Sequence, residues 1–198
     1  MRLSLNKTSL KQQRDHLDMY RRFLPSLDLK RQQLLTAWRN AREELAEVER
    51  QCESARRSRD RLLPLLGSST LRTRDLTRLV QVRSVVIENE NVVGARIPRI
   101  KSVEFERTAY STLTFPFWVD QLVDSLQQIA ELQIRLQVHQ ERAERLSVAS
   151  RKVTQRVNLF EKILIPTAEQ NIKKIRVALS DEERSAVVRS KLAKKKQR

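Results

Sequence analysis

The chain has 198 residues, of which 32% are charged, 5% are aromatic and only two are glycine, and its formal net charge is +16. This composition is typical of an elongated helical protein and excludes a large aromatic core. The single cysteine excludes a disulfide framework and favours a reducing compartment, while the charge predicts an acidic or polyanionic partner.

A periodic hydrophobic seam runs along the first third of the chain. Apolar residues recur in alternating steps of three and four, and only Gln13, Arg31 and Arg59 interrupt them. A 3.5-residue period held this long indicates a helix that supercoils against a partner helix. The seam positions are Leu10, Gln13, Leu17, Tyr20, Leu24, Leu27, Arg31, Leu34, Trp38, Ala41, Leu45, Val48, Cys52, Ala55, Arg59, Leu62 and Leu66.

Capping and helix-breaking residues mark the ends of this first helix, which we expect within residues 1–66. Ser9 and Gln12 have the spacing of a capping box, so the helix should start at Ser9. Pro64 and Gly67 then predict an end between about 63 and 67. Pro25 lies inside the seam and should kink the helix, because proline removes one backbone hydrogen bond.

The spacing of apolar residues changes in residues 67–117. This change predicts a small cap at the closed end of a helical hairpin. Branched residues around Glu88-Asn89-Glu90-Asn91 are typical of a β-hairpin with its turn at this segment. Pro98 cannot donate to a strand ladder, so it should end the second strand or lie on an edge. Residues 68–79 fit a short helix, and Trp118 should anchor the cap on the long helices.

Residues 118–180 form the second long helix, which begins after Thr114-Phe115-Pro116 and supplies the partner for the first. Its seam positions are Ile129, Leu132, Leu136, His139, Ala143, Leu146, Ser150, Val153, Val157, Phe160 and Leu164. The sequence therefore predicts an all-α fold: a long antiparallel two-helix coiled-coil hairpin with a small β-hairpin-containing cap in the middle of the sequence.

If the two antiparallel helices extend equally far, Leu66 faces Leu122, and this pairing sets the register of the whole hairpin. Leu45 then lies at the height of Ala143, and Leu34 near Val153 or Val157. The same register puts His139 near residue 49 and Phe160 near residue 28. Pro25 and Pro166 would fall within one turn of each other and produce one shared bend.

Positive charge is concentrated at the two ends of the chain. Residues 1–31 carry eight basic against three acidic residues, and residues 181–198 carry seven against three. An antiparallel hairpin would bring both ends to one tip. The capping-box pattern Ser180-Asp181-Glu182-Glu183 predicts that a last basic helix or tail begins near Asp181. The basic residues of this predicted tip are Lys7, Lys11, Arg14, Lys191, Lys194, Lys195 and Lys196.

Catalytic, cofactor and metal sites are not expected in this chain. Gly67 and Gly94 are its only glycines, too few for a phosphate-binding loop. His16 and His139 lie on separate helices at different heights, and Cys52 has no second cysteine with which to complete a zinc site. We interpret both histidines as structural or solvent-exposed, and Cys52 and Trp38 as packed seam residues. No apolar run approaches the ~20 residues that span a bilayer, and the start lacks the apolar core of a secretory signal.

Three segments together resemble the D subunit of the V-type (V/A-type) rotary ATPases. The first is Arg156-Val157-Asn158-Leu159-Phe160-Glu161, followed by Ile165-Pro166, Asn171-Ile172, Ile175 and Leu179. The second is Asn91-Val92-Val93-Gly94-Ala95-Arg96-Ile97-Pro98, similar to the family's turn in the cap. The third is Thr8 to Leu10 with Lys30-Arg31 and Leu34. Phe23-Leu24-Pro25 departs from the family, in which many relatives run this helix without proline.

The resemblance implies a non-catalytic central-stalk rotor that couples ATP hydrolysis or synthesis to the transport of protons or sodium ions. It implies A and B subunits around the terminal end, and the F subunit with the membrane collar near the cap, at the cytoplasmic face of the membrane. The implied coupling motif is Arg156, Val157, Asn158, Phe160, Glu161, Pro166 and Asn171, and the implied cap turn is Asn91, Gly94 and Pro98. No direct nucleotide or nucleic-acid partner is expected.

The net charge favours an alternative, a basic coiled coil that binds nucleic acid or an anionic membrane surface. Such a protein would carry one continuous positive face. Acidic residues dilute the middle of the first helix: Glu43, Glu44, Glu47, Glu49, Glu53 and Asp60.

Overall fold

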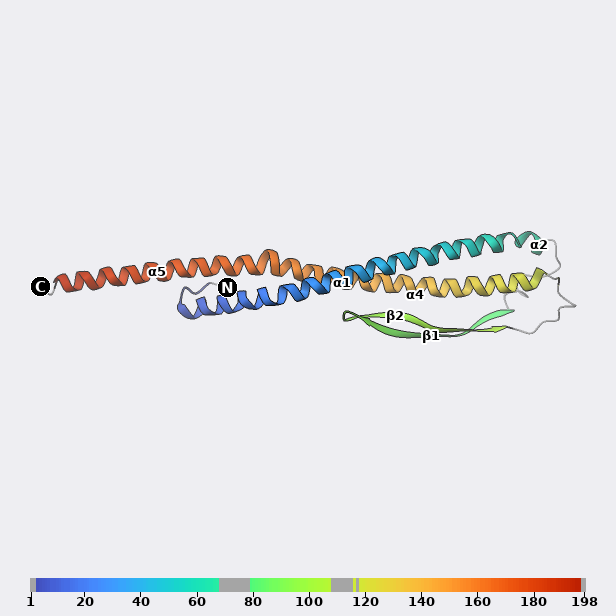
Figure 1. The fold of residues 1–198 in the computed structure, drawn as a ribbon, viewed down its shortest axis with the longest axis horizontal. Helices are drawn as coiled ribbons and strands as arrows, with labels where there is room; N and C mark the ends of the chain where they lie inside the picture. Colours follow the sequence, from blue (N-terminus) through green and yellow to red (C-terminus); the bar gives the residue numbers. More distant parts are fainter. Residues whose placement is uncertain (1–2, 68–78, 108–115, 117, 197–198) are drawn as a thin grey trace. The chain divides into compact units, whose positions relative to one another are not determined.

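The computed structural model of the chain describes residues 3–67, 79–107, 116 and 118–196. Its elements are α1 (Lys7–Asp60), α2 (Leu63–Gly67), β1 (Val80–Val92), β2 (Ala95–Arg107), α4 (Trp118–Leu159), the π-helical segment η1 (Phe160–Leu164) and α5 (Ile165–Lys196) (Figure 1). Two long helical stretches with an antiparallel β-hairpin between them in the sequence confirm the predicted fold class. The short helix predicted at 68–79 lies almost wholly outside the described residues.

The chain divides into two compact units. Gln33–Ser150 forms one, which we call the hairpin-bearing unit, and Met1–Gln32 with Arg151–Arg198 forms the other, the terminal unit. In both, the predicted seams are confirmed, because every seam position whose side chain is described is buried or half-buried.

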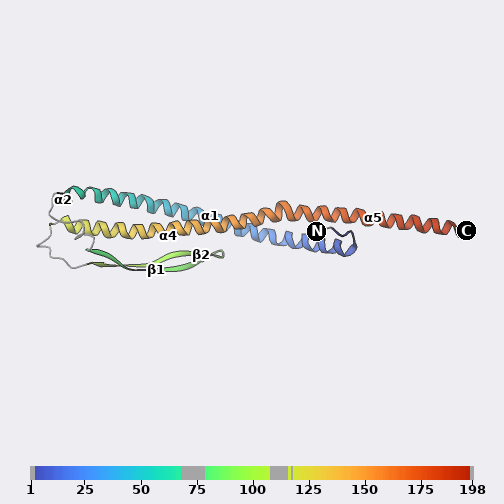
Figure 2. The same ribbon diagram turned by 180° about the vertical axis from the view of Figure 1, so that it is seen from behind.

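In the hairpin-bearing unit, α1 and α4 run antiparallel and side by side (Figure 2). Val48, Cys52 and Ala55 form one buried cluster with Ile129 and Leu132. Burial of these apolar side chains stabilises the pair, at roughly 25 cal/mol for each Å² removed from water.

The register differs from the prediction by about one turn, because Cys52 shares a buried cluster with Ile129 and Leu132, and Leu62 packs against the cluster that contains Leu122. α1 itself ends at Asp60, a turn follows at residues 61–62, and α2 ends at Gly67, inside the predicted range of 63–67. His139 consequently lies 3.5 Å from Glu44 and not near residue 49. Arg142 contacts the same carboxylate, which places Leu45 within one turn of Ala143, as expected.

The β-hairpin is confirmed; its turn does not lie at Glu88–Asn91, as the residue pattern predicted, but within the segment Asn91–Pro98 that the resemblance implied. Val92 pairs with Ala95, so the turn residues are Val93 and Gly94, with φ of 52° and 85°. A two-residue loop with both φ values positive matches the right-handed twist of the strands, and glycine adopts this conformation at little cost. Pro98 does not end β2, since it is buried and pairs with Asn89 inside the ladder. Both strands of a two-stranded sheet are edges, where proline is tolerated.

The hairpin extends along α4 beyond the compact cap that we expected. At its base, Leu79 is buried with Trp118, Val119, Leu122 and Val123, which confirms Trp118 as an anchor. Arg107 Nη2 lies 2.9 Å from Asp124 Oδ1 at the same end. Near the hairpin turn, Arg145 Nη1 donates a hydrogen bond to Arg96 O at 3.2 Å, and Ile97 is fully buried.

The terminal unit is a simpler antiparallel pair. Leu17 is buried with Ala168 and Ile172, and Asn171 Nδ2 donates to Gln13 Oε1 at 3.3 Å. The N-cap of α1 is Asn6, whose Oδ1 accepts from the Ser9 amide at 2.7 Å. The helix therefore begins two residues before the predicted Ser9, because an asparagine carboxamide caps as well as a serine hydroxyl.

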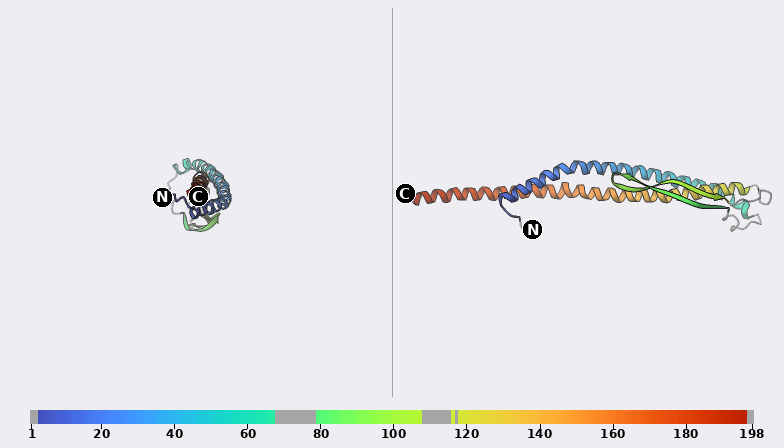
Figure 3. Two further views of the ribbon diagram at one scale, coloured as in Figure 1. Left: turned by 90° about the vertical axis from the view of Figure 1, so that its left-hand side faces the viewer. Right: turned by 90° about the horizontal axis from the view of Figure 1, so that it is seen from below.

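Two further predictions are wrong in the terminal unit. α5 continues through Ser180 to Lys196 and extends past the start of α1 (Figure 3), so no separate helix begins at Asp181. Phe160 packs against Tyr20 and not near residue 28. Leu17 is buried with both Ala168 and Ile172, and Arg21 Nη2 lies 2.7 Å from Glu169 Oε1, so these contacts do not separate Pro25 from Pro166 and the shared bend stays a prediction.

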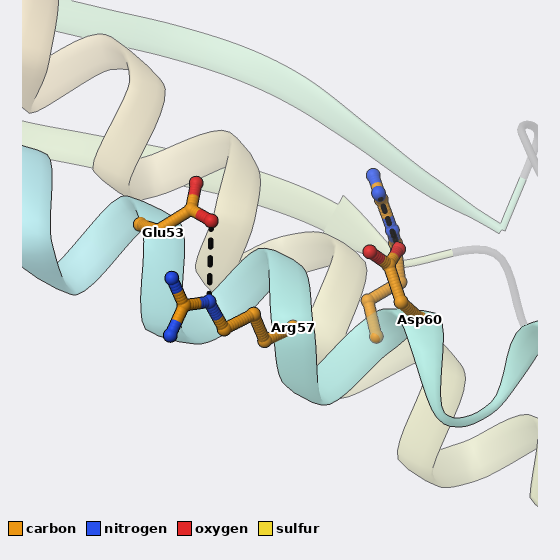
Figure 4. Close-up of polar contacts among 4 residues, drawn as sticks. Glu53, Arg57 and Asp60 are labelled. Carbon is orange, nitrogen blue, oxygen red and sulfur yellow. Dashed lines mark hydrogen bonds and ion pairs between the residues drawn. The ribbon is translucent and has the colours of Figure 1, made fainter.

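Charged side chains near the end of α1 pair with one another. Arg57 Nε donates to Glu53 Oε1 at 3.2 Å, and Arg59 Nη2 lies 2.7 Å from Asp60 Oδ1 (Figure 4). Exposed pairs of this kind contribute little to stability, typically about 0.5 kcal/mol on a helix. They keep the helix surface solvated.

Candidate functional site

The predicted coupling motif surrounds the π-helical turn η1. Val157 is buried, Asn158 is half-buried beside it, and Arg156 and Glu161 are exposed. The rings of Phe160 and Tyr20 meet edge-to-face, with centroids 5.4 Å apart, and Pro166 lies in the first turn of α5. Asn171 lies on the seam side and bonds Gln13. These residues therefore lie along one continuous helical stretch that contains η1, with Asn171 about two turns beyond it.

The predicted cap turn is a rigid hairpin loop. Asn91 Oδ1 accepts a hydrogen bond from the Gly94 amide at 2.9 Å, which fixes the turn. The hairpin exposes four branched apolar side chains of β1, between 36% and 49% accessible: Val82, Val85, Val86 and Ile87. Exposed apolar side chains gathered on one strand are typical of a protein interaction surface.

The structure brings together only part of the predicted basic tip. Lys7, Lys11 and Arg14 of α1 meet Arg176 of α5 around a groove of about 650 Å³. Lys191, Lys194, Lys195 and Lys196 lie further along α5 and are exposed. That end of α5 also exposes three apolar side chains, each more than half accessible: Val187, Val188 and Leu192.

A polar cluster that sequence reasoning missed joins three elements of the hairpin-bearing unit. Arg142 of α4 lies 3.9 Å from Glu44 of α1 and 3.9 Å from Glu90 of β1. Burial lowers the pKa of the neighbouring His139 below 6.5; the Glu44 carboxylate opposes this shift, and Arg142 and Arg135 add to it. Only the folded hairpin brings Glu90 to Arg142, so no spacing in the sequence could have indicated the cluster.

The described residues contain neither a membrane-spanning helix nor a metal-binding cluster. No helix within them is long and apolar enough to cross a membrane. Within the same part of the chain, no group of three or more histidine, cysteine or acidic residues could hold a metal ion.

Comparison with known proteins identifies the family. The sequence pattern of the family described as the ATP synthase D subunit matches residues 9–195. The V-type ATP synthase D subunit of Borreliella burgdorferi is 34% identical over 98% of this chain and 94% of its own length. Those of Chlamydia muridarum and Chlamydia trachomatis serovar L2 are 34% and 35% identical, each over 98% of this chain and 95% of their own length. The chain therefore belongs to the family of ATP synthase D subunits, as the motifs around Asn158 and Gly94 predicted.

Proposed function

We propose that this chain is the non-catalytic central-stalk rotor that couples ATP hydrolysis or synthesis in an A/B hexamer to ion translocation. The observation that carries the proposal is the exposed end of α5. Beyond Glu183 this helix has no acidic residue, and it exposes Val187, Val188 and Leu192 together with its lysines. An exposed stripe that is both apolar and basic favours a surrounding acidic partner over a free solvated tail.

The proposed partners of the terminal unit are the A and B subunits. A rotor tip has to move past successive subunits, so its contacts should be individually weak. Exposed ion pairs have this property, because solvent and salt screen them.

The proposed partners of the hairpin-bearing unit are the F subunit and the membrane collar, at the cytoplasmic face of the membrane. The exposed Val82, Val85, Val86 and Ile87 of β1 support a protein contact on this unit. The family membership supports a place in the same complex.

Truncation of α5 tests the proposal. Deleting residues 190–198 removes the four lysines, and residues 190–196 are all exposed, so the unfolding midpoint should not change. Binding to a reconstituted A/B ring should weaken by about tenfold or more at low salt, and less at high salt. Arg50→Gln with Arg57→Gln, which removes exposed charge from the middle of α1, is the matched control and should bind normally.

The same experiment addresses the alternative function. A truncated chain that binds the ring and supports turnover normally would contradict the proposed role of this segment. Truncation that instead abolishes binding to DNA or to anionic vesicles, with no effect on the ring, would favour the polyanion-binding coiled coil.

A further inference from the structure

The seam of the terminal unit contains one residue more than its period allows. Val153 and Val157 are buried on α4. Continued steps of three and four would next place these residues on the seam: Phe160, Leu164, Thr167, Asn171 and Lys174. The buried residues of α5 are instead Ala168, Ile172 and Ile175, each one position later, while Thr167 and Lys174 are exposed.

The π-helical turn η1 absorbs this extra residue. The backbone N–H of Ile165 bonds to Phe160 O, five residues earlier, where an α-helix would bond four residues back. Such a turn holds one more residue than an α-turn. Val157 on one side and Ala168 on the other can therefore both be buried.

Packing at η1 does not explain why the insertion exists. No residue of η1 is buried, and Ile163 is 55% accessible. Pro166 has no N–H, so the α-helical bond to the Lys162 carbonyl is absent whichever helix type forms. With one backbone hydrogen bond missing and side chains that are at most half-buried, Phe160 against Tyr20 among them, this turn resists twisting less than the regular helix around it.

We propose that η1 is a torsional element, in which the extra residue lets α5 twist against residues 151–159 while both stretches keep their seams packed. This inference rests on the proposed rotor function, because a shaft that transmits torque between successive steps needs a place where it can yield. Pro166 alone would produce a kink but would not shift the seam by one residue.

Deletion of Lys162 tests the element on the isolated full-length chain. Lys162 is exposed, and its loss restores the steps of three and four from Val157 through Ile175. We expect the unfolding midpoint to stay the same or rise, and amide hydrogen exchange across residues 160–166 to slow by roughly tenfold. Lys162→Ala, which keeps the length, should leave both unchanged. Deletion of the exposed Glu144, inside uninterrupted α4, should lower the midpoint because it displaces the seam.

The same variants are then compared in the assembled complex. Deletion of Lys162 should reduce the ions transported for each ATP by about threefold or more relative to Lys162→Ala. Two results would overturn the proposal. If deletion of Lys162 lowers the unfolding midpoint as much as deletion of Glu144 does, packing requires the extra residue. If the deletion variant couples as well as Lys162→Ala, the extra residue has no role in coupling. If the native chain itself does not couple ATP turnover to ion transport, the proposed function is wrong. The hydrogen-exchange experiment on the isolated chain still tests η1 in that case.

Discussion

The two units of the chain pair their helices in the same way but support them differently. In the hairpin-bearing unit the β-hairpin packs against α4 as a third element. A buried cluster around Trp118 joins the base of the hairpin to α4, and another around Cys52 joins α1 to α4. Within the described residues of the terminal unit, α1 pairs with a stretch made of the end of α4, η1 and α5; this unit has a buried cluster around Leu17, a π-helical turn and two prolines. The hairpin-bearing unit is thus supported by a third element, whereas the terminal unit is a helix pair with one irregular turn.

This difference bears on the proposed rotor function. Stiffness comes from buried apolar contacts made at several heights, since each contact that must break raises the cost of twisting. Local irregularity without burial has the opposite effect and lowers the cost of opening. We infer that the hairpin-bearing unit keeps its geometry under load, and that deformation concentrates in the terminal unit.

The largest expected effect is at the base of the hairpin. Trp118→Ala should lower the free energy of unfolding by about 4 kcal/mol, because it empties the cluster shared by α4 and the start of β1. Leu17→Ala, in the smaller cluster of the terminal unit, should cost about 2 kcal/mol. Urea denaturation of both variants measures the two costs. Equal costs would contradict the comparison between the units.

A smaller loss is expected at the π-helical turn. As a fully buried seam residue Phe160 would cost about 3 kcal/mol on truncation, but it is only half-buried and packs edge-to-face on Tyr20. Phe160→Ala should therefore cost about 2 kcal/mol. The neighbouring Leu159 is 42% accessible, so Leu159→Ala should cost much less and serves as the control. No difference between the two variants would show that the Tyr20 contact does not stabilise the pair.

The polar cluster predicts a pH dependence confined to the hairpin-bearing unit. The folded state lowers the pKa of His139, so it disfavours the charged imidazole relative to the unfolded chain. Stability from this residue should be complete above pH 6.5 and should decrease as the pH falls through the lowered pKa. Unfolding curves between about pH 8 and about pH 5 should show this loss, and His139→Gln should remove it. A loss that persists in the variant would assign the effect to other groups.

Most of the helical fold could be predicted from the sequence because the seam period is a local property. Every described position of the two seams is buried or half-buried, including the polar Arg31 and Ser150. The register was wrong by about one turn because the period of a seam does not determine which residue of one helix faces which residue of the other. Helix ends depend on local hydrogen bonds, as the Asn6 cap shows.

The site was predictable only in part. The insertion at η1 is visible in the sequence as the slip from Thr167 to Ala168, and a longer count of the seam would have found it. The residue pattern alone placed the hairpin turn too early, at Glu88–Asn91, because asparagines favour turns; the turn lies at Val93 and Gly94, where Asn91 Oδ1 accepts from the Gly94 amide. Contacts such as Arg142 with Glu90 join distant segments and need the folded hairpin.

The smallest expected effect on stability is at Asn158, and it separates packing from coupling in the terminal unit. Asn158 is half-buried beside Val157, so Asn158→Ala should change the unfolding midpoint little, by about 0.5 kcal/mol or less in free energy. If the motif around η1 acts in coupling, the same substitution should reduce ion transport for each ATP in a reconstituted complex. Gln155→Ala, on the exposed surface of α4 one turn earlier, is the matched control and should couple normally. If the Asn158→Ala variant couples normally, Asn158 has a role in packing and none in coupling. Any torsional role in the terminal unit would then belong to η1.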